Sequence, residues 1–334
     1  MTAIIVPWMK LAVCAVLIGF AGPALIRYGD VIARKTGVSR TWIGLILLAT
    51  ATSLPELFTG LSAVTAASAP NIAVGDALGS CIFNLLMLVL LDAVYRGEPM
   101  YRRVEQGHIL TAGFGIILIG FAGASLLLGS DELKFFHVGA YTPIIIIVYL
   151  VAMRAAFVYE RRQQLPEGMK DTDPSITLKM AAVRYAMAAA VVAAAGTWLP
   201  FVGVEIAEAM GWRTTFVGTL IVAGATSLPE LVVTMSAVRV GALDMAIANL
   251  LGSNLFDVLV LAIDDLAYLP GPLLSAVSPS HAVTAFAAVI MSGLAIVGLL
   301  YRPATRIHGT IGWVSLSMLV VYLLTSYVVF LHGH

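Results

Sequence analysis

Two glutamates in identical surroundings are the residues of this chain best suited to binding a cation. Glu56 and Glu230 each lie in a TSLPEL hexapeptide, at residues 52–57 and 226–231, deep inside long apolar stretches. A carboxylate at that depth costs about 2.5–3.5 kcal/mol on insertion scales. Each could be a structural acid, protonated or hydrogen-bonded to a neighbouring helix. A matched pair in identical motifs favours a function.

A proline and two hydroxyl residues accompany each glutamate. Pro55 and Pro229 directly precede the acids, and they are predicted to kink their helices and release carbonyls near Ala51 and Ala225. Carbonyls released inside a membrane need a partner, and oxygen ligands suit Na⁺ and Ca²⁺. Kinks and hydroxyls are each common in membrane helices, where they also serve packing. Their joint occurrence, twice, indicates an oxygen-lined cation site that includes Thr52, Ser53, Thr226 and Ser227.

A second pair of motifs adds further polar groups. Ser80 and Asn84 are four residues apart in LGSCIFNLLML (78–88), and Ser253 and Asp257 repeat this spacing in LGSNLFDVLVL (251–261). Residues four apart share one helix face. Asp257 is a third deep carboxylate, matched by a neutral asparagine. We predict that all four belong to the site. The alternative is that Asn84 and Asp257 form only an interhelical hydrogen bond.

Other candidate residues carry weaker signals. Asp76 lies on the same helix face as the first of these pairs. It could line the outer approach to the site or be a helix N-terminal acid stabilised by the dipole. Asp92 and Asp265 fall at the ends of apolar segments, where we expect solvated acids. The six His residues lack metal-ligand spacing, and Cys14 and Cys81 form no disulfide framework.

Composition places the chain in a membrane. Apolar residues make up 60% of it and charged residues 11%, against about 25% charged residues in soluble domains. The 334 residues allow ten spans of about 20 residues, with no sizeable soluble domain. The net charge of zero suggests no nucleic-acid partner, and no obligatory protein partner is indicated. The lipid bilayer is the expected surrounding. Without a phosphate loop, nucleophile elbow or dinucleotide fingerprint, we predict neither an enzyme nor a cofactor.

Ten apolar segments are predicted to span the membrane, and residues 11–27 are read as a retained span, not a signal peptide. The longest polar stretch, 159–177, is predicted to be a cytoplasmic linker. With both termini outside, only Lys10, Lys134 and Arg213 of the 19 Lys and Arg residues fall outside, as the positive-inside rule predicts. The predicted localisation is the cell membrane, multi-pass. The spans are 9–28, 41–66, 71–93, 108–129, 135–158, 178–201, 214–238, 244–267, 281–301 and 309–331.

The motifs belong to an internal repeat. Segment 44–57 matches 218–231 at an offset of 174 residues, and 78–88 matches 251–261 at an offset of 173. Each half holds five spans, an odd number, so the second half enters the membrane in the opposite sense. The predicted fold class is all-α integral membrane: ten transmembrane helices as two inverted five-helix repeats. The repeats are residues 1–158 and 178–334. Such architectures are typical of secondary transporters with a midplane site.

At these motifs the sequence resembles the cation/calcium exchanger superfamily, and most closely its prokaryotic sodium/calcium exchangers. The resemblance implies a secondary active antiporter that exchanges Na⁺ for Ca²⁺ by alternating access, with the first and sixth spans sliding across the core. It implies a central set of Glu56, Glu230, Asn84 and Asp257. Ca²⁺ would be held mainly by the two glutamates and the main-chain oxygens of Thr52 and Thr226. Sodium would use Ser53 and Ser80 with the Ala49 carbonyl, and Ser227 and Ser253 with the Ala223 carbonyl.

Departures from the family pattern leave alternatives open. Cys81 replaces an expected Asn, Asp76 an expected Asn, and Ala51 and Ala225 expected glycines; the cysteine bears on ion preference and rate. The nearest rival function is a Ca²⁺/H⁺ or other divalent-cation antiporter on the same fold. The Gly-Asn-x-x-Glu pattern of the proton-coupled branch is absent, which favours sodium. Rivals of other classes are an intramembrane hydrolase using paired acids and a non-transporting cation sensor.

Overall fold

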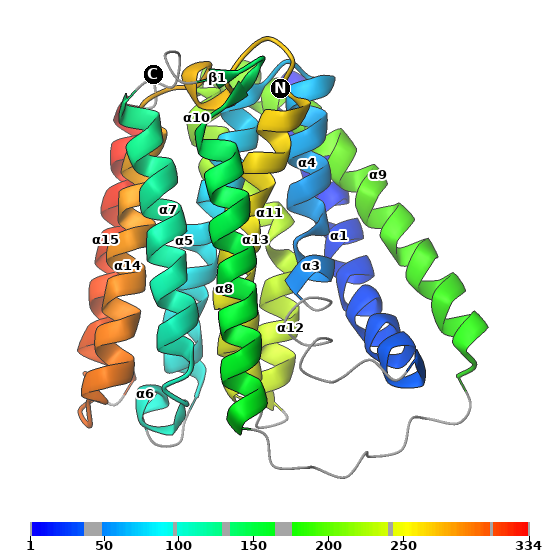
Figure 1. Ribbon diagram of the computed structural model, residues 1–334. Coiled ribbons are helices and arrows are strands. Elements are labelled where there is room, and N and C mark those ends of the chain that lie inside the picture. The colour runs from blue at the N-terminus through cyan, green and yellow to red at the C-terminus, as the bar shows by residue number, and fades with distance from the viewer. Residues whose placement is uncertain are drawn as a thin grey trace.

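The computed structural model describes residues 2–36, 49–95, 99–128, 134–163, 176–239, 243–307 and 310–332. They form a nearly all-helical bundle (Figure 1). The exception to the predicted all-α class is a short antiparallel hairpin of β1 (Lys134–Phe135) and β2 (Val138–Gly139). Because the hairpin occupies its first residues, the predicted span 135–158 begins as a helix only at Tyr141.

Eight helices in the described part of the chain are long and apolar enough to cross a membrane. Each coincides with one of the predicted spans, although α1 and α9, at 35 and 33 residues, are longer than predicted. They are α1 (Thr2–Thr36), α5 (Pro70–Val94), α7 (His108–Leu128), α8 (Tyr141–Gln163), α9 (Leu178–Met210), α13 (Leu243–Ala267), α14 (His281–Tyr301) and α15 (Trp313–His332).

The two predicted spans that carry the TSLPEL motifs are broken. Segment 214–238 consists of α10 (Thr214–Phe216), the π-helix η2 (Val217–Val222), α11 (Ala223–Thr226) and α12 (Leu228–Arg239). The chain bends by 44° between Thr226 and Leu228, directly before Pro229, where a proline ring disrupts the helix. Counting this bent pair as one span gives up to nine. The π-helix was not predicted.

The first motif has the same form. Residues 41–48 of the predicted span 41–66 lie outside the described residues. The remainder forms α3 (Ala49–Thr52) and α4 (Leu54–Thr65), with the break at Ser53. Both prolines therefore stand in the first turn of a new helix, where a missing N–H costs nothing.

The helices that carry the second motifs, α5 and α13, occupy the middle of the bundle (Figure 1). Both are apolar on nearly all faces, and such helices bury themselves among others. They pack on each other and on α4, α12, α7 and α14. α8 covers α13, and α15 covers α5 and α14. α1 and α9 pack together at one side and reach the broken spans (Figure 1). Short elements α6 (Met100–Arg103) and η3 (Leu273–Ser275) lie between the long helices in the chain.

The start of α1 and the end of α15 lie at one end of the bundle, here called the upper end (Figure 1). Most of the predicted linker, residues 164–175, lies outside the described residues. At its end, Thr177 caps α9: its hydroxyl accepts the Met180 N–H at 3.2 Å. Such a cap satisfies one free N–H at the start of a helix.

Asp265 is buried at the upper end, so the prediction that solvent surrounds it is wrong. Its side chain accepts the backbone N–H groups of Gly139 (2.9 Å) and Leu273 (2.7 Å). The hydroxyls of Tyr141 and Thr142 also donate to it. Four donors replace the water that a helix-end acid would otherwise bind, and they join α13 to the hairpin and η3.

The same prediction is wrong for Asp92, at the lower end of α5, which is also buried. Asp92 accepts the Gly312 N–H and the Ser315 hydroxyl, both at 2.7 Å, and lies 3.7 Å from the Arg306 guanidinium. Gly312 and Ser315 stand 173 positions after Gly139 and Thr142, as Asp265 stands after Asp92. The two networks are therefore counterparts at opposite ends of the bundle.

Two histidines form a second matched pair of contacts. His108 Nε2 lies 3.1 Å from Asp244 Oδ1, and His281 Nε2 lies 3.2 Å from Asn71 Oδ1. His108 and Asn71 are again 173 positions before His281 and Asp244. The histidines do not cluster with each other; each joins the start of one helix to the start of another.

Candidate cation site

The two motif glutamates meet in the middle of the bundle. Glu56 lies in the first turn of α4 and Glu230 in the first turn of α12. Each side chain is only 1% exposed. The two carboxylates are near enough to repel each other, and Asp257 contributes to the repulsion. The start of a helix carries a partial positive charge, so both breaks orient favourable dipoles toward the acids.

Serines from both motif copies hold Glu230. The hydroxyls of Ser53 and Ser253 donate to Oε1 of Glu230 at 3.2 and 3.4 Å. The Thr52 hydroxyl lies 3.4 Å from that of Ser253. One serine comes from the same half of the sequence as Glu230 and the other from the opposite half.

Glu56 has the equivalent arrangement. The hydroxyls of Ser80 and Ser227 donate to its Oε1 at 3.4 and 3.3 Å, and the two hydroxyls lie 3.1 Å apart. Each of the four serines therefore donates a hydrogen bond to one of the two glutamates. The site is built jointly by the two motif copies.

Asn84 and Asp257 face each other between α5 and α13. The Asn84 amide donates to Oδ2 of Asp257 at 3.3 Å, so the interhelical hydrogen bond considered above exists. The Cys81 thiol lies 4.0 Å from the same oxygen and 3.8 Å from the Asn254 carbonyl. Cys81 is therefore a direct neighbour of the third carboxylate, where the second motif copy has an asparagine.

The two glutamates, Asn84 and Asp257 each have one side-chain oxygen without a hydrogen-bond donor in the described part of the chain. These atoms are buried: Oε2 of Glu56 and Glu230, Oδ1 of Asn84 and Oδ1 of Asp257. Buried polar atoms are usually hydrogen-bonded. Oxygen atoms with free lone pairs are the kind of ligand that cations such as Na⁺ and Ca²⁺ take.

The remaining predicted ligands lie along the broken spans. The Thr226 hydroxyl lies 2.9 Å from Asp76 Oδ1 and 3.1 Å from the carbonyl of Ala223. That carbonyl also accepts the Ser227 N–H at 3.0 Å. Ala49 is the first residue of α3. No three His, Cys, Asp or Glu side chains among the described residues form a tight metal cluster, so coordination would need hydroxyl, amide and main-chain oxygens too.

Asp76 is a further buried carboxylate, which accepts the Thr226 hydroxyl at the second break. It is 1% exposed and lies two turns into α5, so it is neither a helix N-terminal acid nor part of a solvent-exposed approach in this structure. Its shared helix face with Ser80 was the signal that could have placed it here. Asp264, on α13, is also fully buried. No role for Asp264 was predicted from the sequence.

Two glycines allow α1 and α9 to contact the kinks. Gly22 of α1 lies against Pro229: a Cβ there would come 2.6 Å from the proline Cβ. Gly196 of α9 lies against Pro55, where a Cβ would come 3.0 Å from its carbonyl oxygen. The two glycines are 174 positions apart. The first and sixth predicted spans therefore pack directly on the segments that carry the glutamates.

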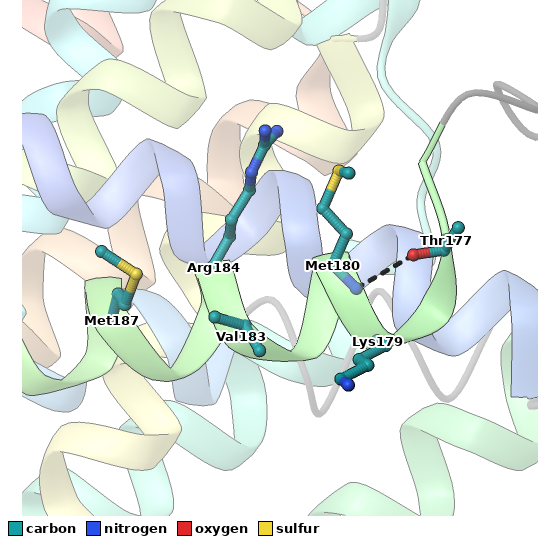
Figure 2. Close-up of a pocket in the computed structure, with 6 residues that line it drawn as sticks. All are labelled: Thr177, Lys179, Met180, Val183, Arg184 and Met187. Carbon is teal, nitrogen blue, oxygen red and sulfur yellow. Dashed lines mark hydrogen bonds between the residues drawn. The ribbon is translucent and has the colours of Figure 1, made fainter.

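A surface groove of about 410 Å³ lies at the lower end of α9, away from these carboxylates (Figure 2). Arg184 extends from it toward α1, where it donates to the Tyr28 hydroxyl at 3.1 Å. None of the predicted ion ligands lines this groove. Its lining residues are Thr177, Lys179, Met180, Val183, Arg184 and Met187.

Comparison with known proteins places the chain in a family. The family described as sodium/calcium exchanger protein matches residues 6–167 and 180–328. The putative antiporter CaxA of Alkalimonas amylolytica is 27% identical over 87% of this chain and 89% of its own length. The sodium/calcium exchanger MaX1 of Methanosarcina acetivorans is 26% identical over 73% of this chain and 78% of its own.

The fold also has a solved counterpart. The structure of the sodium-calcium exchanger NCX_Mj superposes with a TM-score of 0.62 and 24% identity, covering 96% of this chain and 98% of that one. An uncharacterized membrane protein of Methanocaldococcus jannaschii is 28% identical over 68% of this chain and 70% of its own. The arrangement of the helices is thus that of a known exchanger fold.

Proposed function

Because the chain belongs to the sodium/calcium exchanger family, within the cation/calcium exchanger superfamily, we propose that it exchanges Na⁺ for Ca²⁺ by alternating access. The family makes it a multi-pass membrane transporter of the cation/calcium exchanger type. The observation that carries the choice of ions is the set of free, buried oxygens on Glu56, Glu230, Asn84 and Asp257.

In this proposal Ca²⁺ is held mainly by Glu56 and Glu230, together with main-chain oxygens of Thr52 and Thr226. The free carboxylate oxygens support this assignment, since Ca²⁺ takes six to eight oxygen ligands. Two carboxylates balance its charge.

Sodium ions use the hydroxyls around the same carboxylates. One site takes Ser53, Ser80 and the Ala49 carbonyl; the other takes Ser227, Ser253 and the Ala223 carbonyl. The serines support this because each already contacts one of the two glutamates. Na⁺ and Ca²⁺ then compete for one set of oxygens, and this competition couples the two fluxes. Crossing with empty sites is disfavoured because uncompensated charges in a low dielectric are costly.

The proposed topology has ten spans in two inverted halves, residues 1–158 and 178–334, joined by the cytoplasmic linker 159–177. Both termini lie outside the cell. The matched networks of Asp92 and Asp265, at opposite ends of the bundle, support the inversion. The start of α1 and the end of α15 at one end of the bundle support an even number of spans (Figure 1).

Alternating access is proposed to occur by sliding of α1 and α9 across the remaining helices. Both helices pack mainly on each other and on the broken spans. Their contacts with the kinks run through glycines, Gly22 and Gly196, which present backbone and no side chain to the facing surface. Such a surface supports relative movement.

The decisive experiment measures ⁴⁵Ca²⁺ uptake into sodium-loaded proteoliposomes. The wild-type protein is expected to accumulate Ca²⁺ only with an outward sodium gradient. Glu56→Gln and Glu230→Gln each remove one ligand charge and should abolish uptake, while the exposed Glu208→Gln serves as the matched control. Wild-type exchange rates in either ligand variant would refute the site.

The same vesicles separate the rival functions. Uptake driven by a pH gradient in the absence of sodium would identify a Ca²⁺/H⁺ antiporter. Binding of Ca²⁺ without any flux would identify a sensor.

A further inference from the structure

Asp264 is the buried acid that the proposed exchange site leaves unexplained. Its side chain is fully buried, and neither carboxylate oxygen has a hydrogen-bond donor in the described part of the chain. A carboxylate left uncompensated within an apolar bundle is costly. Asp265, the next residue, has four donors, so the lack of partners is specific to Asp264.

Asp264 lies beside Asp76, above the central site. It follows Asp257 by seven residues on α13, and Asp76 precedes Asn84 by eight residues on α5. Because these two helices run in opposite directions and meet at the Asn84–Asp257 hydrogen bond, both acids lie about 11 Å, two turns, toward the upper end. The two carboxylates are near enough to repel each other.

Asp76 also has one buried oxygen without a donor in the described part of the chain. Its Oδ1 accepts the Thr226 hydroxyl, but its Oδ2 has no donor among the described residues. Together with both oxygens of Asp264, three buried carboxylate oxygens thus lack donors. A tyrosine, arginine or lysine could have satisfied them, as the donors around Asp92 and Asp265 do.

A glycine makes room for the Asp264 carboxylate. It lies directly against Gly60 of α4, in space that the Cβ of any other residue would occupy. Gly60 is one turn beyond Glu56 on the same helix. The backbone of α4 therefore forms one wall of this place, and the central site lies immediately below it.

The other half of the molecule lacks all three features. The counterparts of Gly60, Asp76 and Asp264 in the repeat are Thr234, Asn249 and Leu91. At the opposite end the amide of Asn249 lies 3.5 Å from the Thr234 hydroxyl. Neutral side chains therefore occupy the equivalent positions there. The fold does not require acids at these positions. Three neighbouring residues that differ from their counterparts in the repeat indicate a function specific to this half of the molecule.

We propose that Asp76 and Asp264 bind a divalent cation, such as Ca²⁺, at a second site on the upper side of the central carboxylates. Two carboxylates balance the charge of one divalent cation, and the Thr226 hydroxyl lies alongside as a further oxygen. An ion bound there would lie between the upper end of the bundle and the central site. Because the other half of the molecule lacks these acids, only one side of the membrane would have such a site. This inference does not depend on which ion drives exchange.

The test counts bound ions on purified full-length protein with Mn²⁺ as the probe and ⁴⁵Ca²⁺ as its competitor. The Glu56→Gln/Glu230→Gln protein, which lacks both glutamate charges of the central site, is expected to retain one Mn²⁺ per chain that Ca²⁺ displaces. Adding Asp264→Leu, the residue of the other half, should weaken that binding by about ten- to a hundredfold, as loss of a charged ligand does. Asp264→Asn provides a second variant should the leucine impair folding.

Adding Asp244→Asn instead, an acid at the start of the same helix, should leave the retained ion in place. The proposal is overturned if the Glu56→Gln/Glu230→Gln protein binds no Mn²⁺, or if its binding survives both Asp264 variants. Because occupancy is read without transport, a wild-type protein that fails to exchange Na⁺ for Ca²⁺ would refute the proposed function and leave this test intact.

Discussion

At the scale of single residues, existing hydrogen bonds determine which oxygens of the site are available to an ion. Each glutamate has one oxygen that accepts hydrogen bonds from two serines, and one oxygen without a donor among the described residues. The serines fix the direction of the carboxylates, and the free oxygens are available to an ion. Cys81 is the exception in this oxygen-rich group, because its thiol lies 4.0 Å from Asp257.

Cys81 predicts sensitivity to thiol-binding metals. A thiolate prefers softer cations than Ca²⁺, so Cd²⁺ should inhibit exchange by binding between Cys81 and Asp257. Cys81→Ser should raise the Cd²⁺ concentration for half inhibition about tenfold or more, corresponding to about 1.4 kcal/mol of lost binding. Concentration–inhibition curves in proteoliposomes provide the measurement. Cys14→Ser, which alters a buried thiol on α1, is the control, and an equal shift in that variant would contradict the prediction.

At the scale of helices, the breaks at Ser53 and Ser227 position the site. Each break ends one helix and begins another, so a glutamate, a proline and two hydroxyls gather within one turn. α1 and α9 contact these breaks through Gly22 and Gly196. The proposed sliding of α1 and α9 would therefore depend on the absence of a side chain at these two contacts.

Gly22→Ala is expected to slow exchange. The added Cβ would meet the ring of Pro229 at 2.6 Å, and overpacking of this kind costs about 1–3 kcal/mol. A cost of about 1.4 kcal/mol on the sliding step would lower the rate tenfold. Rates of ⁴⁵Ca²⁺ uptake should decrease in Gly22→Ala and remain normal in Gly113→Ala, where nothing lies within 4 Å of the added atom. Equal rates in the two variants would count against sliding at this contact.

At the scale of the whole molecule, matched contacts at opposite ends hold the bundle together. Asp92 joins α5 to the start of α15, and Asp265 joins α13 to the hairpin and α8. The contacts of His108 and His281 repeat the same relation. These groups lie at the ends of the bundle, about two turns or more from the Asn84–Asp257 contact, and are expected to affect stability more than ion binding.

Asp92→Ala and Asp265→Ala should each lower the melting temperature of the detergent-solubilised protein. Each change leaves buried N–H and hydroxyl donors without their acceptor, at a cost of about 1–3 kcal/mol per group. Thermal unfolding followed by intrinsic fluorescence gives the measurement, with the exposed Glu208→Ala as control. A melting temperature equal to that of the control would show that the networks do not stabilise the fold.

The proposed topology, with both termini outside the cell, predicts which end of the bundle is accessible from outside. In a protein with both native cysteines replaced by serine, His332→Cys should react with a membrane-impermeant thiol reagent in intact cells. Leu178→Cys, at the start of α9 beside the linker, should react only after permeabilisation. The opposite labelling pattern would show that the protein has the reverse orientation in the membrane.

The sequence by itself determined the membrane class, the positions of the long apolar helices, the repeat and the motif residues. These follow from local properties: hydropathy over about 20 residues, a proline that prevents helix continuation, and identity between two segments. The bend before Pro229 could be predicted for this reason. The interhelical contact of Asn84 with Asp257 could be named as a possibility because both lie on motif faces.

Only the tertiary structure decided which acids are solvated and which are buried. Asp92, Asp265 and Asp264 have similar positions near helix ends. The first two accept hydrogen bonds from residues more than 100 positions away, whereas the third accepts none from the residues that the structure describes. The hairpin at 134–139 and the contact of Gly60 with Asp264 likewise arise from chain packing. Periodicity and composition describe each segment alone, whereas the environment of a side chain is set by the segments that pack against it.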